Sequence, residues 1–210
     1  DYLLIDRRVK DAFLERAEHW VRRLYGKNAL DNQGYVHMIN EKHFRRVCSL
    51  IDPGKVVLGG GWDEATLRIQ PTILDNVSPE DPVMQEEIFG PVLPVISFDR
   101  LEEAEDFILD RPRPLALYLF SQDRAVRRRF VERVPFGGGC INDTILHLTN
   151  PRLPFGGVGN SGVGRYHGKY SFDTFSHVKG VLQSSSRVDL PVRYPPYTPE
   201  KMRLVRRFLK

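Results

Sequence analysis

Two adjacent carboxylates, Glu86 and Glu87, stand before an apolar pair and a Gly-Pro turn, in the segment Gln85-Glu86-Glu87-Ile88-Phe89-Gly90-Pro91. Successive residues of a helical turn point about 100° apart, so these carboxylates cannot both face one pocket. The turn begins a predicted strand, and in open α/β sheets ligands gather at strand ends and the adjoining loops. The segment is either a ligand-contacting strand end or a solvated acidic turn, and the residues alone favour the acidic turn.

A second segment, residues 153–168, is dense in glycine and contains the pattern Gly157-x-Gly159-x-x-Gly162. A dinucleotide-binding fingerprint needs a strand running into the first glycine and an acidic residue about 20 positions later. Here Pro154 interrupts any strand, and position 182 is Leu. The segment is therefore predicted to be a loop whose backbone approaches another group closely, and not a Rossmann fingerprint.

The cysteines and histidines predict no metal site, because none has a metal-ligand spacing. Cys48 belongs to an apolar stripe at helical spacing with Phe44, Val47 and Ile51, and Cys140 falls in a short predicted buried strand. Both thiols are predicted to serve apolar packing. Two free thiols favour a reducing compartment, and the expected location is cytoplasmic.

Composition excludes several classes of protein. The 210 residues are 41% hydrophobic and 28% charged, with a net charge of +4. The densest basic run, Arg124 and residues 127–129, is predicted on the solvated side of a helix, so no nucleic-acid partner is expected. No apolar run approaches the roughly 20 residues that span a membrane.

The elements that position these segments alternate strands with amphipathic helices. Residues 9–25 form a predicted helix with Phe13, Ala17, Trp20, Val21 and Leu24 on one face. Two further helices are predicted at residues 41–51, capped by Asn40, and 101–109, capped by Asp99, and a fourth at residues 124–134. Strands are predicted at residues 2–5, 55–58, 67–74, 91–98, 115–120 and around 140–141. This order predicts an α/β fold with a mostly parallel sheet between two helical layers.

The two chemical segments together resemble the aldehyde dehydrogenase superfamily, and most closely its class 3, the fatty-aldehyde type. Residues 85–91 resemble the family's Glu-x-Phe-Gly-Pro motif, and residues 153–162, continued by 166–169 and 171–177, resemble the class 3 signature. Residues 114–118 and 193–196 match as well. The resemblance covers nearly the whole chain.

The resemblance implies oxidation of an aldehyde to a carboxylic acid, through a cysteine-bound hemithioacetal and thioester, with NAD or NADP as cofactor. Glu87 would hydrogen-bond the ribose hydroxyls beside the nicotinamide, and Phe89 would pack against that end of the cofactor. Leu148, Thr149 and Phe155 would line the aldehyde tunnel, with His167 beside it. Two alternatives stay open: Phe155 as a plain core residue, and His167 as a hydrogen-bonded loop anchor.

By the same resemblance, the family's nucleophilic cysteine and general-base glutamate are expected before residue 1, together with the half that binds the adenosine. No catalytic residue is therefore assigned within the chain, which reads as a fragment and is expected to oxidise no aldehyde alone. Residues 1–177 would form the catalytic domain, and residues 178–210 an oligomerisation strand (178–184) and arm of a homodimer. The alternative is a non-catalytic folding or assembly module.

The basic C-terminal tail raises one further possibility. Met202, Val205, Phe208 and Leu209 can share one face of a helix surrounded by lysine and arginine, as in a helix that lies on a membrane. The apolar area is small, so an ordinary terminal helix is favoured and membrane association is not expected.

Overall fold

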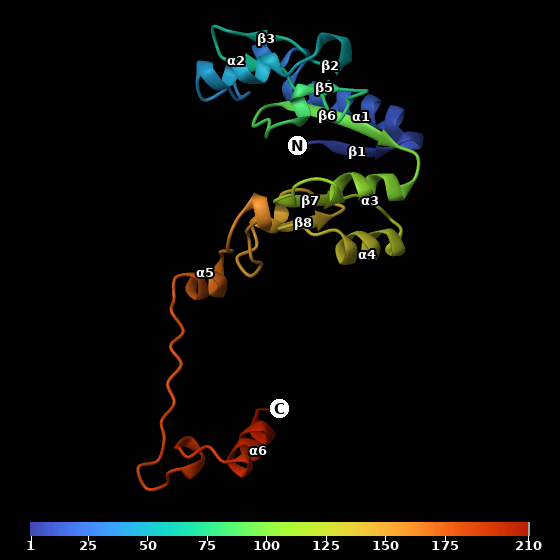
Figure 1. The fold of residues 1–210 in the computed structure, drawn as a ribbon. Helices are drawn as coiled ribbons and strands as arrows, with labels where there is room; N and C mark the ends of the chain where they lie inside the picture. The colour runs from blue at the N-terminus through green and yellow to red at the C-terminus, as the bar shows by residue number, and fades with distance from the viewer. Residues whose placement is uncertain (210) are drawn as a thin grey trace.

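The computed structural model describes residues 1–209, and it contains a four-stranded sheet of order β1-β6-β5-β2 (Figure 1). The strand β6 (Val92–Phe98) runs parallel to β1 (Leu3–Asp6) and to β5 (Thr72–Leu74), whereas β2 (Val56–Leu58) is antiparallel to β5. A second sheet pairs β7 (Ala116–Leu119) in parallel with β8 (Gly138–Ile141). A small hairpin joins β3 (Trp62–Asp63) to β4 (Arg68–Ile69).

Helices cover both faces of the larger sheet, because successive side chains of β6 point to opposite faces. Leu93 and Val95 pack toward α1 (Arg7–Tyr25), while Val92 and Ile96 pack toward α2 (Glu41–Ser49). The helices α3 (Leu101–Leu109) and α4 (Arg124–Arg133) share a core that takes in residues of both sheets: Leu4, Phe98, Ala104, Ile108, Leu117, Leu119, Phe130 and Val134. The predicted α/β class, with a parallel sheet between helical layers, is confirmed.

Short 3-10 helices punctuate the connections, at Ala29–Asp31, Pro53–Lys55, Pro82–Met84, Leu146–Leu148, Gly159–Ser161 and Pro191–Arg193. The cap predicted for α2 is confirmed, since the Asn40 side chain accepts a hydrogen bond from the backbone N–H of His43 at 2.9 Å. That bond satisfies one of the N–H groups that a helix start leaves free.

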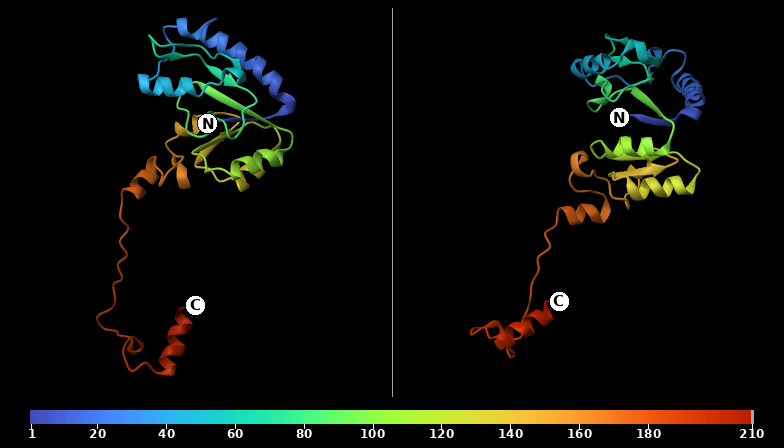
Figure 2. Two further views of the ribbon diagram at one scale, coloured as in Figure 1. Left: turned by 45° about the horizontal axis from the view of Figure 1, so that its top comes forward. Right: turned by 45° about the vertical axis from the view of Figure 1, so that its right-hand side comes forward.

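Several predicted features differ from the structure. The strand expected over residues 67–74 breaks into β4 and β5 around Pro71, whose nitrogen carries no hydrogen for a sheet ladder. The predicted face of α1 is only half right, because Phe13 and Ala17 pack on the sheet while Trp20 and Leu24 are exposed. The carboxyl-terminal end of α1 extends beyond the strands of the sheet that it covers (Figure 2).

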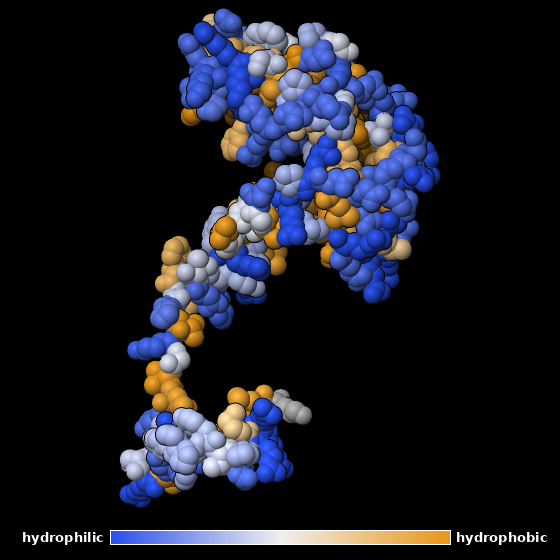
Figure 3. All heavy atoms as spheres, in the orientation of Figure 1, coloured by the Kyte–Doolittle hydropathy of each residue, from blue (hydrophilic) through white to orange (hydrophobic). Residues whose placement is uncertain are grey.

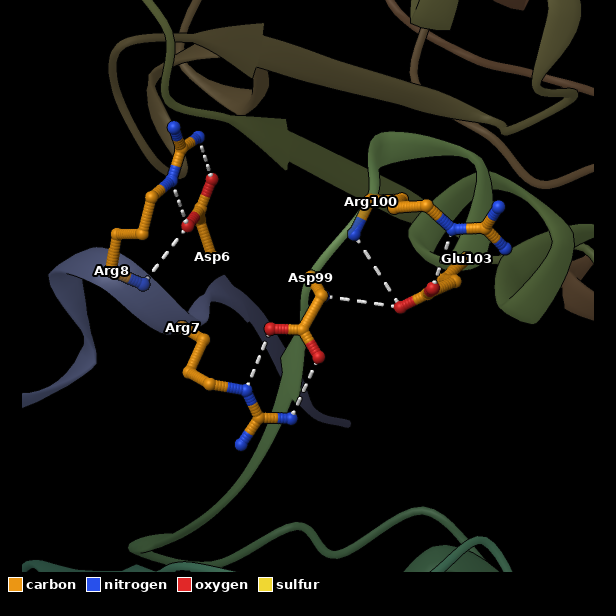
Figure 4. Close-up of polar contacts among 6 residues, drawn as sticks. All are labelled: Asp6, Arg7, Arg8, Asp99, Arg100 and Glu103. Atoms are coloured by element: carbon orange, nitrogen blue, oxygen red, sulfur yellow. Dashed lines mark hydrogen bonds and ion pairs between the residues drawn. The ribbon is translucent and has the colours of Figure 1, made fainter.

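The predicted cap of α3 is also wrong. Arg100, and not Asp99, is the N-cap residue. The Asp99 carboxylate instead pairs with Arg7 at 2.8 Å, and Glu103 accepts a hydrogen bond from the Asp99 N–H at 3.1 Å (Figure 4). A glutamate one turn inside the helix therefore caps its start, and Asp99 ties β6 to α1.

Beyond α5 (Gly168–Thr174) the chain leads away from the sheets and ends in α6 (Pro199–Phe208) (Figures 1 and 2). Residues 178–184, predicted as a strand, form none within this chain, and Val178 and Leu182 are 90% and 91% exposed. Figure 3 shows hydrophobic residues along this extended segment. Within residues 1–209, no helix is long and apolar enough to cross a membrane.

Candidate functional site

The acidic segment lies at the amino end of β6, where its backbone is held by Arg46 of α2. The Arg46 guanidinium donates to the carbonyl oxygens of Glu87 at 3.1 Å and Ile88 at 2.6 Å, and it pairs with the Glu86 carboxylate at 2.9 Å. Ile88 is fully buried between the two exposed residues Glu87 and Phe89. The segment thus presents one carboxylate and one aromatic ring from an anchored backbone.

Phe89 carries a backbone strain that its surroundings impose. Its φ angle is +49°, in the left-handed region that bulky residues rarely adopt, and its side chain is 76% exposed. A Cβ on the next residue, Gly90, would stand 2.7 Å from Cγ1 of Val47, so only glycine fits the turn there. A strained residue that exposes an aromatic ring is typical of a ligand-contacting position.

Glu86 and Glu87 are both exposed, and they differ in their partners. Arg46 neutralises Glu86, whereas within residues 1–209 the Glu87 carboxylate takes part in no hydrogen bond or ion pair. Residue 1 lies beside them, since the Ile88 N–H donates to Asp1 Oδ2 at 3.1 Å.

A second group of candidate residues gathers in the loops of the β7–β8 sheet. Phe155 and Tyr166 form an antiparallel bridge with N···O distances of 3.0 and 2.9 Å, and the Phe155 ring stacks on His167 at 6.2 Å. Nδ1 of His167 lies 3.1 Å from the carbonyl oxygen of Leu153, and the backbone N–H of His167 donates to Ser171 Oγ at 2.9 Å. These contacts anchor the loop, and Phe155 is half-buried between them.

Leu148 and Thr149 lie beside this group. Leu148 is half-buried at the end of a 3-10 turn, and the exposed Thr149 donates from Oγ1 to the carbonyl oxygen of Leu146 at 2.9 Å. The preceding Ile145 has a φ angle of +63°, a strained conformation for a β-branched residue. The intervening His147 is buried and contacts the Phe155 ring at 6.0 Å, which links the turn to the aromatic group.

The two groups of candidate residues therefore sit on different sheets. The amino terminus of the chain lies between them in Figures 1 and 2. The structure brings together Phe155 and His167, and it places Leu148 and Thr149 next to them through His147. Among the described residues, no cluster of three or more His, Cys, Asp or Glu side chains could hold a metal ion.

Sequence reasoning missed two residues of these surroundings, Arg46 and His147. Arg46 stands 40 positions before Glu86 and has no local signal. His147 is the one ionisable residue in Ile145-Leu146-His147-Leu148, and that contrast with its apolar neighbours could have singled it out.

Cys48 packs against the core as predicted, and burial raises the pKa of its thiol. For Cys140 the prediction of purely apolar packing is wrong, because its Sγ lies 3.6 Å from His147 Nδ1.

Comparison with known proteins places the whole chain in one family. The model of the aldehyde dehydrogenase family matches residues 1–181. The dimeric NADP-preferring aldehyde dehydrogenase of Rattus norvegicus is 47% identical over 207 residues, which cover 96% of this chain and 45% of that protein. Aldehyde dehydrogenase family 3 member A2 of the same organism is 44% identical over 211 residues, which cover 100% of this chain and 44% of that protein.

A solved structure agrees in three dimensions. The substrate-bound state of Staphylococcus aureus AldH has a TM-score of 0.89 at 46% identity, covering 100% of this chain and 46% of that chain. The chain thus spans less than half the length of these relatives. The motifs quoted from the sequence, the family match and the likeness in structure agree: the chain belongs to the aldehyde dehydrogenase family, and the relatives that it resembles include a family 3 member.

Proposed function

We propose that the protein containing this chain oxidises an aldehyde to a carboxylic acid with NAD or NADP. The proposal is carried by one observation, the exposed pair Glu87 and Phe89 on a backbone that Arg46 and Gly90 hold in a strained conformation. Family membership supports the same reaction. A pair held so firmly toward solvent fits a positioning role toward a bound molecule.

The two side chains suit the nicotinamide end of such a cofactor. The Glu87 carboxylate has no partner within residues 1–209 and can accept hydrogen bonds from both hydroxyls of a ribose. The Phe89 ring offers an apolar face that limits the movement of a flat heterocycle. The cofactor, when bound, supplies the hydride acceptor. Glu87 and Phe89 would hold it in place, and Arg46 would keep both side chains in register.

The aldehyde would lie against the other group of residues. Leu148, Thr149 and Phe155 would line its tunnel, with His167 beside it, and the half-buried Phe155 ring offers apolar contact. Since His167 is also engaged with Leu153, its nearer role would be to hold the loop that carries Phe155. The reacting cysteine and general-base glutamate would come from outside these 210 residues, as the family resemblance implies. Within the chain, Cys48 packs against the core and Cys140 lies in the separate β7–β8 sheet.

A pair of phenylalanine variants tests the cofactor site in the protein with its natural termini. Phe89→Ala is expected to lower kcat/KM by about two- to tenfold, because a lost aromatic contact costs about 0.5–1.5 kcal/mol. Phe172→Ala is the matched control, since Phe172 is 72% exposed on α5 and outside the proposed site. Rates follow from the absorbance of the reduced nicotinamide. If both variants lowered kcat/KM equally, Phe89 would have no specific role in the cofactor site.

The inactivity of the isolated chain is a separate part of the proposal. Purified residues 1–210, given an aldehyde and NAD or NADP, should produce no reduced cofactor, while the natural protein does. If the 210 residues alone reduced the cofactor at a measurable rate, the nucleophile could not lie outside them.

We also propose that residues 178–210 act in assembly, as the arm of a homodimer. The supporting observation is the exposure of three apolar residues, Val178, Val181 and Leu182, along a segment without secondary structure. Such a row costs free energy in water and is relieved when a second copy covers it. A chain serving only folding or assembly would dimerise without any turnover.

A further inference from the structure

Cys140 and His147 form a thiol–imidazole pair beside β8. The distance from Cys140 Sγ to His147 Nδ1 is 3.6 Å, within the range of a hydrogen bond to sulfur. Cys140 is half-buried, so part of the residue is open to solvent, whereas His147 is 7% exposed. The other ring nitrogen, Nε2, is buried and has no hydrogen-bond partner within residues 1–209.

The fold fixes this pair from several directions. Cys140 stands opposite Tyr118 in the parallel β7–β8 register, and the Tyr118 ring meets the His147 ring edge-on at 5.8 Å. Phe155 contacts the imidazole from another element at 6.0 Å. A Cβ on Gly138 would stand 3.1 Å from His147 Cδ2, so the glycine makes room for the ring. Packing thus holds Nδ1 toward Sγ, although the polar Nε2 atom stays unsatisfied.

A buried imidazole with an unsatisfied nitrogen is unusual, because burying a polar atom without a hydrogen bond costs about 1–3 kcal/mol. Plain packing does not need a histidine at this position, since an aromatic hydrocarbon ring would fill the same space. The imidazole adds a base directed at a half-buried thiol. This is the arrangement that activates cysteine nucleophiles, in which the thiolate and not the thiol reacts.

We propose that Cys140 is a modification site, activated by His147, that is alkylated by α,β-unsaturated carbonyl compounds. His147 Nδ1 takes the proton from Cys140 Sγ, and the sulfur electron pair forms a C–S bond to the β-carbon of the reagent. The carbon–carbon π pair moves to give an enolate, and the proton on Nδ1 passes to the α-carbon. The product is a thioether that contains all atoms of both reactants, so no oxidant or reductant is required.

The second cysteine provides a comparison within the same chain. Cys48 packs on the core around α2, and burial raises the pKa of its thiol, with the Glu64 carboxylate raising it further. No histidine is bonded to it among the contacts of the described residues. A single alkylation experiment can therefore compare the activated thiol of Cys140 with the thiol of Cys48 in the same chain.

The test is the alkylation rate of each cysteine in the protein with its natural termini, using N-ethylmaleimide and peptide mass spectrometry. At pH 7, Cys140 is expected to react at least about tenfold faster than Cys48, because His147 can accept its proton as the C–S bond forms, whereas Cys48 has no histidine bonded to it. His147→Phe keeps an aromatic ring in the packing and should slow Cys140 about tenfold, while Cys48 keeps its rate. Equal rates in the natural protein, or an unchanged Cys140 rate in the variant, would overturn the proposal.

A faster reaction of Cys48 in the variant would reveal unfolding, and the natural protein then decides by comparison with a free thiol. A thiol with a base beside it should react faster at pH 7 than free N-acetylcysteine under the same conditions. An equal or lower rate of Cys140 would contradict the pair. None of these measurements depends on aldehyde oxidation, so they test the role of Cys140 independently of the proposed function.

Discussion

Glu87 and Glu86 are chemically identical neighbours whose surroundings separate them, and this difference can be tested. Glu87→Gln removes the charge that would hold two ribose hydroxyls but leaves the shape unchanged. Because positioning is the expected loss, hydride transfer should slow about tenfold while the Kd of the cofactor changes less. Single-turnover measurement of cofactor reduction, beside a titration of cofactor binding, separates the two quantities.

Glu86→Gln is the matched control for that change. The Glu86 carboxylate pairs with Arg46, which keeps its two bonds to backbone carbonyl oxygens in the variant. Turnover should therefore stay close to that of the natural protein. A Glu87→Gln variant whose only defect is weaker cofactor binding would argue against a positioning role.

Asp6 gives a prediction about pH. A hydrogen bond from the Arg8 side chain, followed by one from the Arg8 N–H, lowers the pKa of Asp6 to about 2 (Figure 4). The folded pKa lies below the unfolded value near 3.8, so this interaction stabilises the fold at higher pH and is lost as pH falls toward 2. Arg8→Ala should raise the pKa of Asp6 part of the way back, as measured by carboxyl chemical shifts.

Arg7→Ala serves as the control, because the Arg7 side chain pairs with Asp99 and not with Asp6. The Arg7→Ala variant should leave the pKa of Asp6 unchanged. If both arginine variants moved the Asp6 pKa equally, a general effect of net charge and not the local bond would explain the shift.

At the scale of elements, a buried carboxylate links α3 with α4. The fully buried Glu105 carboxylate pairs with Arg129 at 2.5 Å and with Arg133 at 3.0 Å. Glu105→Ala removes the charge-assisted hydrogen bonds that join the two helices and is expected to lower the free energy of unfolding by about 1.5–3 kcal/mol. Glu102→Ala removes an exposed partner of Arg129 and should cost less than about 1 kcal/mol. Similar urea midpoints for the two variants would refute the role of burial.

The contact between α2 and the turn before β6 depends on Gly90 having no side chain. A methyl group at Gly90 would press on Val47, so Gly90→Ala should destabilise the fold by about 1–3 kcal/mol, the usual cost of overpacking. Gly180→Ala is the control, since nothing lies within 4 Å of its added Cβ. Denaturant unfolding compares them, and equal stabilities would show that the turn relaxes freely.

The elements that local signals predict are those confirmed. The apolar spacing of residues 41–51 and the Asn40 cap act within one or two turns, so α2 could be located before any tertiary contact was known. The errors fall where distant partners intervene. Asp99 is drawn to Arg7, which is 92 positions away, and the end of α1 extends past the sheet that its apolar residues were expected to contact.

For the molecule as a whole, the exposed arm is the feature that predicts assembly. Val181→Asp places a charge in the proposed dimer contact and should convert the dimer to a monomer, because a buried unpaired charge is costly. Val163→Asp makes the same change at a fully exposed position outside the arm and should leave the mass unchanged. Sedimentation at several concentrations measures both. A dimer that survives Val181→Asp would place its interface elsewhere.

Local patterns in the chain were sufficient for its α/β class, most helices and strands, and the motifs that mark its family, because apolar periodicity, turn chemistry and caps act over a few residues. Folding alone decided the contacts between remote segments: Arg46 on the backbone of Glu87, Glu105 between two arginines, and His147 against Cys140. Such contacts require two elements to pack in one register, which short-range spacing does not encode. The roles of Glu87, Phe89, Leu148, Thr149, Phe155 and His167 stay predictions that the variants above address.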